Sequence, residues 1–358
     1  LAVAARELAA AVEGEVRFDL HNRMLYATDA SLYQVEPLGV VIPASIEDAL
    51  RAMEFCAQRG LPILPRGGGT SLAGQCVNRA VVLDFSARCT ALKSVDVAAR
   101  TCEVEPGIAI DDLNEQLAKH GLFFAPDPAT TRQCNVGGAI GNNAAGARSI
   151  MFGRTSENLL GVDAAVVHDG AVRRVWLEKG AAGRDEFVRD LTLCVAEVVE
   201  RHAGLIRERF PKTIRRNAGY GLDMVLAQMD GAGRDADSGR MLDAIDLAHL
   251  LCGSEGTLAV TLGARLKLEP LPKAKGLAVI GLASLEDAVE LVQPILGTKP
   301  SAVEILDDTI LDLAAANAEY RRYVELMPAP DGAPLKAVLY VEYFGQGDEC
   351  ILTTIKVG

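Results

Sequence analysis

The chain of 358 residues has few aromatic residues (5%), only five histidines and no paired cysteine motif. Its eight cysteines are scattered, and the lack of any Cys-x-x-Cys pair excludes a zinc ribbon or an iron–sulfur ligand set within this sequence. No apolar run approaches the ~20 residues that a membrane-spanning helix needs. We therefore expect a reduced cytoplasmic protein, with peripheral attachment at the inner face of the membrane as the alternative.

Basic residues are also in short supply. Lys and Arg number 36 against 48 Asp and Glu, which gives a net charge of −12, and no basic run occurs. This balance argues against nucleic-acid binding, because a duplex or single strand is held by clustered positive charge. With 49% hydrophobic residues the chain can bury a large core, and its length favours two domains that act on small molecules.

A first glycine-rich motif runs from Leu64 to Gln75 and reads LPRGGGTSLAGQ. Three consecutive glycines followed by two hydroxyl residues form a loop whose backbone N–H groups can surround an anion such as a pyrophosphate. A Walker loop is excluded because Gln75 and Cys76 stand where Lys and Ser or Thr are required. Leu72 replaces the third glycine of the dinucleotide fingerprint. A glycine-rich surface turn is the alternative interpretation.

The residues around this motif predict a small α/β arrangement. Residues 38–42 form a short apolar run, and Ser45 with Asp48 three residues later is typical of a helix start. Apolar residues then recur at helical spacing as far as Gly60. Strands are predicted at 61–64 and 80–84, so the glycine loop follows the carboxyl end of a strand, where ligands of such sheets usually bind.

Two further motifs are rich in glycine. Residues 135–146 read NVGGAIGNNAAG, and their small side chains would let a flat ring lie against the backbone while Asn142 and Asn143 bond its polar edge. Close packing of a helix on a strand would require small residues equally well. Residues 252–260 read CGSEGTLAV, with glycines that permit a tight backbone and with Glu255, which could equally be a solvated turn residue.

Together these motifs resemble the FAD-binding domain of the vanillyl-alcohol oxidase and p-cresol methylhydroxylase type. The resemblance is strongest to the D-2-hydroxy-acid dehydrogenase branch, which includes D-lactate, glycolate and D-2-hydroxyglutarate dehydrogenases. It implies an α+β fold in which residues 1–270 form a two-subdomain FAD-binding domain, divided into about 15–92 and 93–270. Residues 271–358 would begin a substrate-covering α+β cap domain that is incomplete in this chain.

The resemblance implies that FAD contacts all three motifs, with its pyrophosphate at residues 66–72 and its ring near 137–146. Family members that attach FAD covalently often carry His where this chain has Thr70, so non-covalent FAD is expected. The implied cofactor-binding residues are Pro65, Arg66, Gly67, Gly68, Gly69, Thr70, Ser71, Leu72, Gly74, Gln75, Pro126, Asp127, Val136, Gly137, Gly138, Gly141, Asn142, Asn143, Ala145, Gly146, Gly256 and Val260.

The implied reaction moves a hydride from the carbinol carbon of a D-2-hydroxy acid to flavin N5. Such a site needs a base for the hydroxyl proton and a cation for the substrate carboxylate. The base and metal motifs of this branch do not occur in the sequence, so neither a catalytic base nor a metal ligand is assigned. The candidate carboxylate anchors are Arg148, Arg154, Arg215 and Tyr220, of which the arginines suit bidentate binding.

Two other functions remain open. One is a flavin-dependent transferase of the alkyl-glycerone-phosphate synthase type, which shares the fold, and the other is a flavin-holding electron-transfer or interaction domain without a substrate of its own. The resemblance implies a small hydroxy-acid substrate and an electron acceptor, either a downstream iron–sulfur domain or a quinone. The sequence does not decide which hydroxy acid or which acceptor is used.

Overall fold

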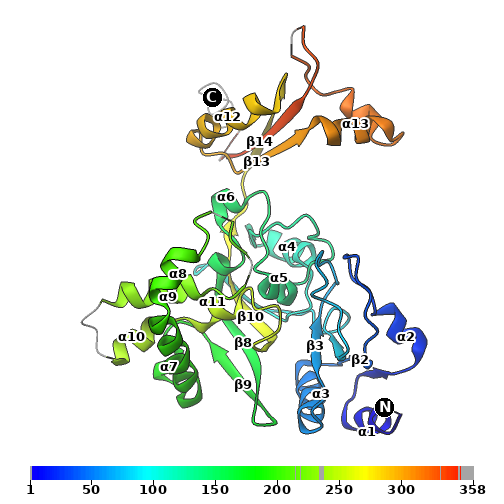
Figure 1. Cartoon of the computed structure of the whole chain (residues 1–358), viewed down its shortest axis with the longest axis vertical. Helices are drawn as coiled ribbons and strands as arrows, with labels where there is room; N and C mark the ends of the chain where they lie inside the picture. Colours follow the sequence, from blue (N-terminus) through cyan, green and yellow to red (C-terminus); the bar gives the residue numbers. More distant parts are fainter. Residues whose placement is uncertain are drawn as a thin grey trace. The chain divides into compact units, whose positions relative to one another are not determined.

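The computed structural model describes residues 2–213, 215–217, 219–233, 238–330, 332–345 and 347. The chain divides into two compact units, each considered by itself. Unit 1 comprises Leu1–Ala145 and Arg154–Glu269, and unit 2 comprises Gly146–Gly153 and the residues from Pro270 onward. Figure 1 shows that helices and strands are mixed in both units, as the α+β prediction requires.

The first sheet of unit 1 contains the predicted strand–helix–strand arrangement. Its strand order is β1-β2-β4-β3, in which β2, β4 and β3 run parallel and β1 pairs antiparallel with β2. The Ser45 hydroxyl accepts a hydrogen bond from the Asp48 N–H at 3.1 Å and starts helix α3, as its sequence spacing predicted. The elements are β1 (Glu15–Arg17), β2 (Gly39–Ile42), β3 (Ile63–Arg66), β4 (Val81–Asp84), α1 (Ala2–Ala11), α2 (Leu20–Leu25) and α3 (Ile46–Gln58).

The second sheet of unit 1 is antiparallel, with the order β5-β6-β10-β8-β9. Strands β8 and β9 form a hairpin whose two-residue turn, Asp169 and Gly170, has φ of 49° and 74°, as a tight primed turn requires. The strands are β5 (Leu92–Asp96), β6 (Thr101–Val104), β8 (Leu159–His168), β9 (Ala171–Leu177) and β10 (Val260–Lys267). The short strands β7 (Leu122–Phe123) and β11 (Glu269–Pro270) pair in a separate two-stranded sheet.

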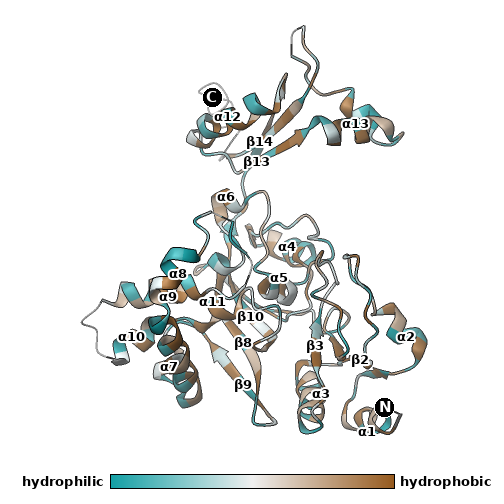
Figure 2. Ribbon diagram, in the orientation of Figure 1, coloured by the Kyte–Doolittle hydropathy of each residue, from teal (hydrophilic) through white to brown (hydrophobic). Residues whose placement is uncertain are grey.

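Helices of unit 1 bury their apolar faces against this second sheet and against one another. The largest cluster of buried side chains includes Leu113, Ile140, Val199 and Leu266, each of which is 0% exposed. Helices α3 and α7 carry both brown and teal residues in Figure 2, as helices with one buried and one solvated face do. The helices are α4 (Ile110–Ala118), α5 (Val136–Asn142), α7 (Glu186–Arg201), α8 (Ala203–Arg209), α9 (Leu222–Ala232), α10 (Ser238–Ala244) and α11 (Leu247–Leu251).

Unit 2 is built on a three-stranded antiparallel sheet of order β12-β14-β13. Helix α12 covers this sheet through Ala288 and Ile295, which pack on Leu339, Val341 and Tyr343. This mixture of helices and strands agrees with the α+β arrangement predicted for this part of the sequence. The elements are β12 (Ala274–Leu282), β13 (Ala302–Asp307), β14 (Ala337–Gly345), α6 (Ser149–Phe152), α12 (Leu285–Gly297), α13 (Asp308–Ala316) and α14 (Arg321–Val324).

Candidate cofactor and substrate sites

The three glycine-rich motifs, which are far apart in the sequence, converge on one cavity in unit 1, called here the first cavity. Residues of each motif form part of its wall, and Phe85, Pro106, Leu251, Ala259 and Thr261 complete it. The lining residues from the motifs are Pro65, Arg66, Gly67, Ser71, Gln75 and Cys76 from the first, Gly137, Gly138 and Gly141 from the second, and Ser254, Glu255 and Gly256 from the third.

The loop of the first motif is held in shape by Arg66 at the end of β3. Its guanidinium donates to the carbonyl oxygens of Tyr26 at 3.1 Å, Thr28 at 2.7 Å and Cys76 at 2.8 Å. Gly69 adopts φ of 66°, a backbone conformation that residues with a β-carbon rarely take. Arg66 therefore ties the first loop to the backbone near residues 26–28, and its positive charge lies at the cavity wall.

Close packing within the protein requires glycine at Gly67 and Gly68. A β-carbon at Gly68 would lie 2.0 Å from the backbone oxygen of Gln133, and one at Gly67 would lie 2.6 Å from the side-chain oxygen of Asn135. The sequence suggested that these positions are small so that an anion can approach them. The structure shows in addition that the first and second motifs pack too closely here for any side chain.

Two of the three glycines of α5, Gly138 and Gly141, differ from those of the first loop. Val136, Ala139 and Ile140 are fully buried on one face of α5, and the helix packs against β10 (Figure 1). The opposite face carries Gly138 and Gly141, which line the cavity. A β-carbon at Gly138 would meet no atom within 4 Å, and one at Gly141 would meet only Glu255, at 3.8 Å. Gly138 and Gly141 therefore form a flat part of the cavity wall, called here the cavity floor, from which no side chain projects.

The third motif closes the cavity with a tight loop. Gly253, Glu255 and Gly256 all have positive φ, of 89°, 53° and 75°. The N–H groups of Gly253 and Glu255 donate to the carbonyls of Ile140 and Gly141 at 2.9 Å, which fixes the loop on α5. Ser254 is 2% exposed, and its hydroxyl finds no hydrogen-bond partner in the described part of the chain. A buried hydroxyl without a partner is costly, so a ligand group in the cavity would satisfy it.

Glu255 connects the three motifs through its side chain. Its Oε1 accepts a hydrogen bond from the Asn142 amide at 3.0 Å, and the Gln75 side chain also bonds to it. Burial raises the pKa of Glu255, and the two amide bonds offset part of that rise. Sequence reasoning missed Ser254 and left Glu255 undecided; the available signal was a hydroxyl and a carboxyl residue enclosed by two glycines.

The chemical character of the residues that line the first cavity suits a dinucleotide that contains a flat ring. The glycine floor leaves room that a β-carbon would fill, and the unpaired Ser254 hydroxyl offers a hydrogen bond. The cavity is narrow, about 80 Å³. Pockets that enclose a whole ligand measure roughly 300–1,000 Å³, so this cavity would hold only part of a bound dinucleotide.

Other residues that the resemblance implied do not line the first cavity. Val136 and Val260 are core residues, 0% and 6% exposed, and Leu72 is 80% exposed on the loop surface. Asn143 is 6% exposed and accepts hydrogen bonds from the Ser156 N–H at 3.0 Å and the Cys252 thiol at 3.5 Å. Gly68, Gly69, Thr70, Gly74, Pro126, Asp127, Asn142, Ala145 and Gly146 are also absent from its lining among the described residues.

A second cavity of about 440 Å³ in unit 1 contains three of the four candidate carboxylate anchors. Arg215 and Tyr220 are exposed on its wall, and the Tyr220 hydroxyl lies 2.9 Å from the Thr257 hydroxyl of the third motif. Its lining residues are Asn143, Arg154, Arg209, Phe210, Pro211, Thr213, Arg215, Arg216, Asn217, Gly219, Tyr220, Gly221, Asp223 and Met224.

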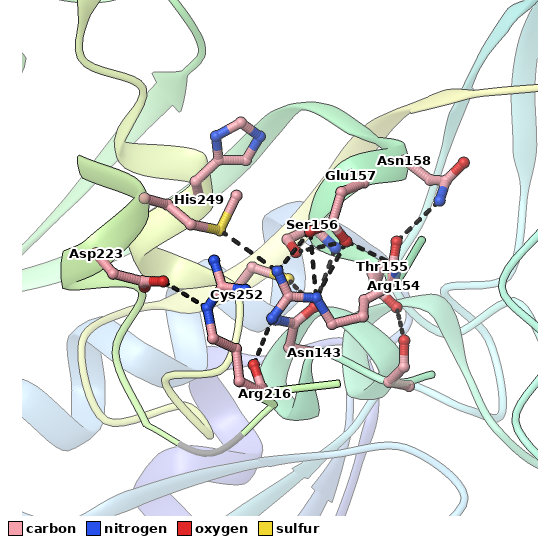
Figure 3. A network of polar contacts seen from close by, with 12 residues as sticks. Asn143, Arg154, Thr155, Ser156, Glu157, Asn158, Arg216, Asp223, His249 and Cys252 are labelled. Atoms are coloured by element: carbon pink, nitrogen blue, oxygen red, sulfur yellow. Dashed lines mark hydrogen bonds and ion pairs between the residues drawn. The ribbon is translucent and has the colours of Figure 1, made fainter. Parts of the chain in front are cut away.

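Arg154, the third anchor candidate at this cavity, is 4% exposed and sits at the centre of the polar network in Figure 3. Its guanidinium forms an ion pair with Glu157 and donates to the backbone oxygen of Arg216. Burial alone would raise the pKa of Glu157, but the hydrogen bonds from Arg154 lower it below its ordinary value. This commitment to internal partners favours a structural role for Arg154.

Arg148, the fourth anchor candidate, lies in unit 2. Its Nε and Nη2 donate to the two carboxylate oxygens of Glu342 at 2.8 and 3.0 Å, and Ser301 donates to the same carboxylate at 2.8 Å. Burial raises the pKa of Glu342, but the bonds from Arg148 and Ser301 outweigh it and lower that pKa. Arg148 therefore joins the segment 146–153 to strand β14 of the same unit.

Comparison with known proteins agrees with the motifs. Residues 37–175 match the model of the FAD binding domain family. The chain is 30% identical over 340 residues to a D-2-hydroxyglutarate dehydrogenase of Pseudomonas putida, which covers 93% of this chain and 32% of that protein. It is 25% identical over 306 residues to glycolate oxidase subunit GlcD of Bacillus subtilis, covering 84% of this chain and 52% of the subunit.

The solved structure of an alkyldihydroxyacetonephosphate synthase superposes on the chain with a TM-score of 0.67. The match covers 100% of this chain and 59% of the synthase at 18% identity, so it shows a shared fold. The domain match at residues 37–175 and the hydroxy-acid dehydrogenases among the relatives confirm the predicted resemblance to the D-2-hydroxy-acid dehydrogenase branch. The chain spans about a third of the length of the D-2-hydroxyglutarate dehydrogenases that it matches.

The described part of the chain shows neither a metal-ion cluster nor a membrane-spanning helix. No three His, Cys, Asp or Glu side chains in that part of the chain gather closely enough to hold a metal ion. None of the described helices combines the length and the apolar character needed to cross a bilayer. The seven described cysteines are free thiols, and Cys350 lies outside the described residues.

Proposed function

We propose that the chain is the flavin-binding part of an FAD-dependent oxidoreductase that acts on a D-2-hydroxy acid. The observation that carries this proposal is the convergence of three separated motifs on the first cavity. The family match at residues 37–175 and the D-2-hydroxy-acid dehydrogenases among the relatives support the same reaction class. Bound FAD would supply a hydride acceptor, N5, for the hydrogen on the carbinol carbon of the substrate.

The residues of the first cavity divide into three roles in this proposal. The loop at 67–71 holds the cofactor's pyrophosphate, with the Arg66 charge beside it. Gly138 and Gly141 form the surface on which a flat part of the cofactor lies. The buried hydroxyl of Ser254 forms a hydrogen bond with a polar group of the cofactor. Thr70 carries no ring nitrogen, so the link to FAD is non-covalent.

Substrate binding is proposed for the second cavity, where Arg215 and Tyr220 face the same space. A guanidinium matches a carboxylate in a bidentate arrangement, and Tyr220 is coupled to the third motif through Thr257. Unit 1 would then be the FAD-binding domain and unit 2 the beginning of a substrate-covering domain. No histidine lines the first cavity within the described residues, and we assign no catalytic base to this chain.

The electron acceptor follows from the reaction rather than from the cavity. A hydride taken from the substrate must leave again as electrons, and we propose an iron–sulfur domain or a quinone as the acceptor. The transferase alternative is supported only by the shared fold, at 18% identity. A transferase would return the flavin to its oxidised state without net electron transfer, so no acceptor would be reduced.

An absorption spectrum of the purified chain, taken before and after acid precipitation, tests the cofactor. We expect oxidised flavin before precipitation and its complete release into the supernatant afterwards, because nothing links it covalently. Flavin that remains in the pellet would contradict the non-covalent proposal. A chain that takes up no FAD on reconstitution would contradict the cofactor site itself.

Anaerobic addition of D-lactate, glycolate or D-2-hydroxyglutarate to the flavin-loaded chain tests the reaction. We expect one of these acids to bleach the flavin and Arg215→Ala to slow the bleaching. Arg207→Ala is a matched control, because Arg207 is an exposed arginine of α8 that pairs with Asp230 and does not line the second cavity. Equal bleaching by both variants would contradict the role of Arg215, and flavin that none of the three acids bleaches would contradict the proposed substrate class for this chain.

A further inference from the structure

The charge of the first cavity is unusual for a site that takes a pyrophosphate. Among the described residues that line it, Arg66 is the cationic side chain and Glu255 is the acidic one, so the two formal charges cancel. The pyrophosphate of FAD adds two negative charges. An ionised Glu255 in the same cavity would repel them, and the repulsion would be strong because the cavity is partly desolvated.

The surroundings of Glu255 hold few groups that could compensate this charge. The two side chains bonded to it, Asn142 of α5 and Gln75 of the first loop, are neutral amides. Arg66 and Cys76 are the titratable groups that the first loop brings to the cavity, and Arg66 already serves three backbone carbonyls. On the same loop as Glu255, Cys252 has a fully buried thiol whose pKa burial raises. The helix α5 contributes no charged residue.

We propose that Glu255 is a cofactor-positioning residue that takes up one proton from solvent when FAD binds. This inference rests on the proposed function, since it requires FAD in the first cavity. The protonated carboxyl keeps the Asn142 hydrogen bond on one oxygen and gains an O–H group with which to donate a hydrogen bond. It thereby changes from a repelling charge into a neutral group that holds the three motifs around the cofactor.

The structure prepares Glu255 for this change. Burial has already raised the pKa of Glu255 above its ordinary value, and its strained backbone, with φ of 53°, holds the side chain at the cavity. The negative charge of FAD raises the pKa further, so the bound state holds one more proton than the free state. By linkage, the affinity for FAD then falls about tenfold for each unit by which the pH rises, in the range between the Glu255 pKa of the free chain and that of the FAD-bound chain.

Isothermal titration calorimetry of the flavin-free chain with FAD tests the proposal. Titrations in pairs of buffers with different ionisation enthalpies, from about pH 6 to about pH 8, count the protons taken up on binding. We expect up to one proton per FAD for the wild-type chain and none for Glu255→Gln, which is neutral at every pH and nearly the same shape. At the highest pH the variant should bind FAD at least tenfold more tightly than the wild type.

A matched acidic control separates this effect from a general change of charge. Glu103→Gln removes a half-buried carboxylate of β6 that pairs with Arg265 and does not line the first cavity, so it should keep the wild-type proton uptake. Riboflavin, which has no pyrophosphate, should bind to the wild type without proton uptake. Uptake with riboflavin equal to that with FAD would show that the pyrophosphate charge is not the cause and would overturn the proposal.

Two other outcomes would also overturn it. Binding of FAD to the wild type without proton uptake at any pH would show that Glu255 does not change its state. Weaker binding by Glu255→Gln across the whole range, with a native circular dichroism spectrum, would show that an ionised carboxylate accepts a hydrogen bond from the cofactor. A wild-type chain that binds no FAD would instead contradict the proposed function on which the inference rests.

Discussion

Gly68 in the first loop and Gly138 in α5 are glycine for different physical reasons. At Gly68 a β-carbon would collide with the backbone of Gln133, whereas at Gly138 it would meet no atom within 4 Å. Gly68 is therefore glycine because a neighbouring segment of the protein packs against it. Gly138 is glycine although no protein atom would contact its side chain. Only the second kind points directly to a ligand, which a sequence motif alone cannot show.

The largest expected effect comes from Gly68→Ala. Because its methyl group would lie 2.0 Å from a backbone oxygen, the two motifs must move apart, and overpacking of this kind costs about 3 kcal/mol of unfolding free energy. Urea denaturation of the flavin-free chain measures the loss. A flavin-free variant as stable as the wild type would show that this position is reserved for the cofactor alone, and the comparison would fail.

Gly138→Ala should separate stability from cofactor binding. Alanine in place of a helical glycine stabilises by roughly 0.5–1 kcal/mol, and the structure offers no clash to offset this gain. The methyl group would stand on the cavity floor, so FAD binding should weaken roughly tenfold or more, as an overpacked contact implies. Fluorescence titration with FAD and urea denaturation measure the two effects.

A matched control for this variant is Gly204→Ala. Gly204 lies in α8, its β-carbon would also meet nothing within 4 Å, and it does not line the first cavity. It should raise stability and leave FAD affinity unchanged. If both variants bind FAD as the wild type does, the floor formed by α5 is not part of the cofactor site.

Ser254→Ala should have a smaller effect, again on binding alone. The hydroxyl has no partner in the described structure, so its removal takes no hydrogen bond from the flavin-free chain, and the stability should not fall. One lost hydrogen bond to the cofactor is worth about 1 kcal/mol, or roughly fivefold in affinity. A drop in the thermal midpoint of the flavin-free variant, with unchanged FAD binding, would assign Ser254 to the fold instead.

The smallest effect concerns the pH dependence of stability. Burial raises the pKa of Glu255 in the folded chain above its ordinary value, so its contribution to stability is fully present below the unfolded pKa and is lost as the pH rises through the folded pKa. The flavin-free wild type should therefore lose stability relative to Glu255→Gln over this window. Parallel pH profiles of the two proteins in urea denaturation would contradict the raised pKa.

Local patterns predicted several elements because their physical causes are local. The start of α3 at Ser45, for example, depends on a side-chain bond to a residue three positions later. The partners of Arg148 and Arg154 could not be predicted in this way. Arg148 pairs with Glu342, which is 194 residues away, and Arg154 contacts Arg216 and Met224, which are 62 and 70 residues away.

The sequence by itself determined the class of the domain, because the glycines and hydroxyl residues that a pyrophosphate loop requires are contiguous along the chain. It also determined that Thr70 cannot form a histidyl link to the flavin. Only the tertiary structure decided which glycines face empty space, that Ser254 lacks a partner, and that Glu255 joins three motifs. These properties depend on distances between segments more than 100 residues apart, such as Asn142 and Glu255, and those distances are set by how β10 and α5 pack together.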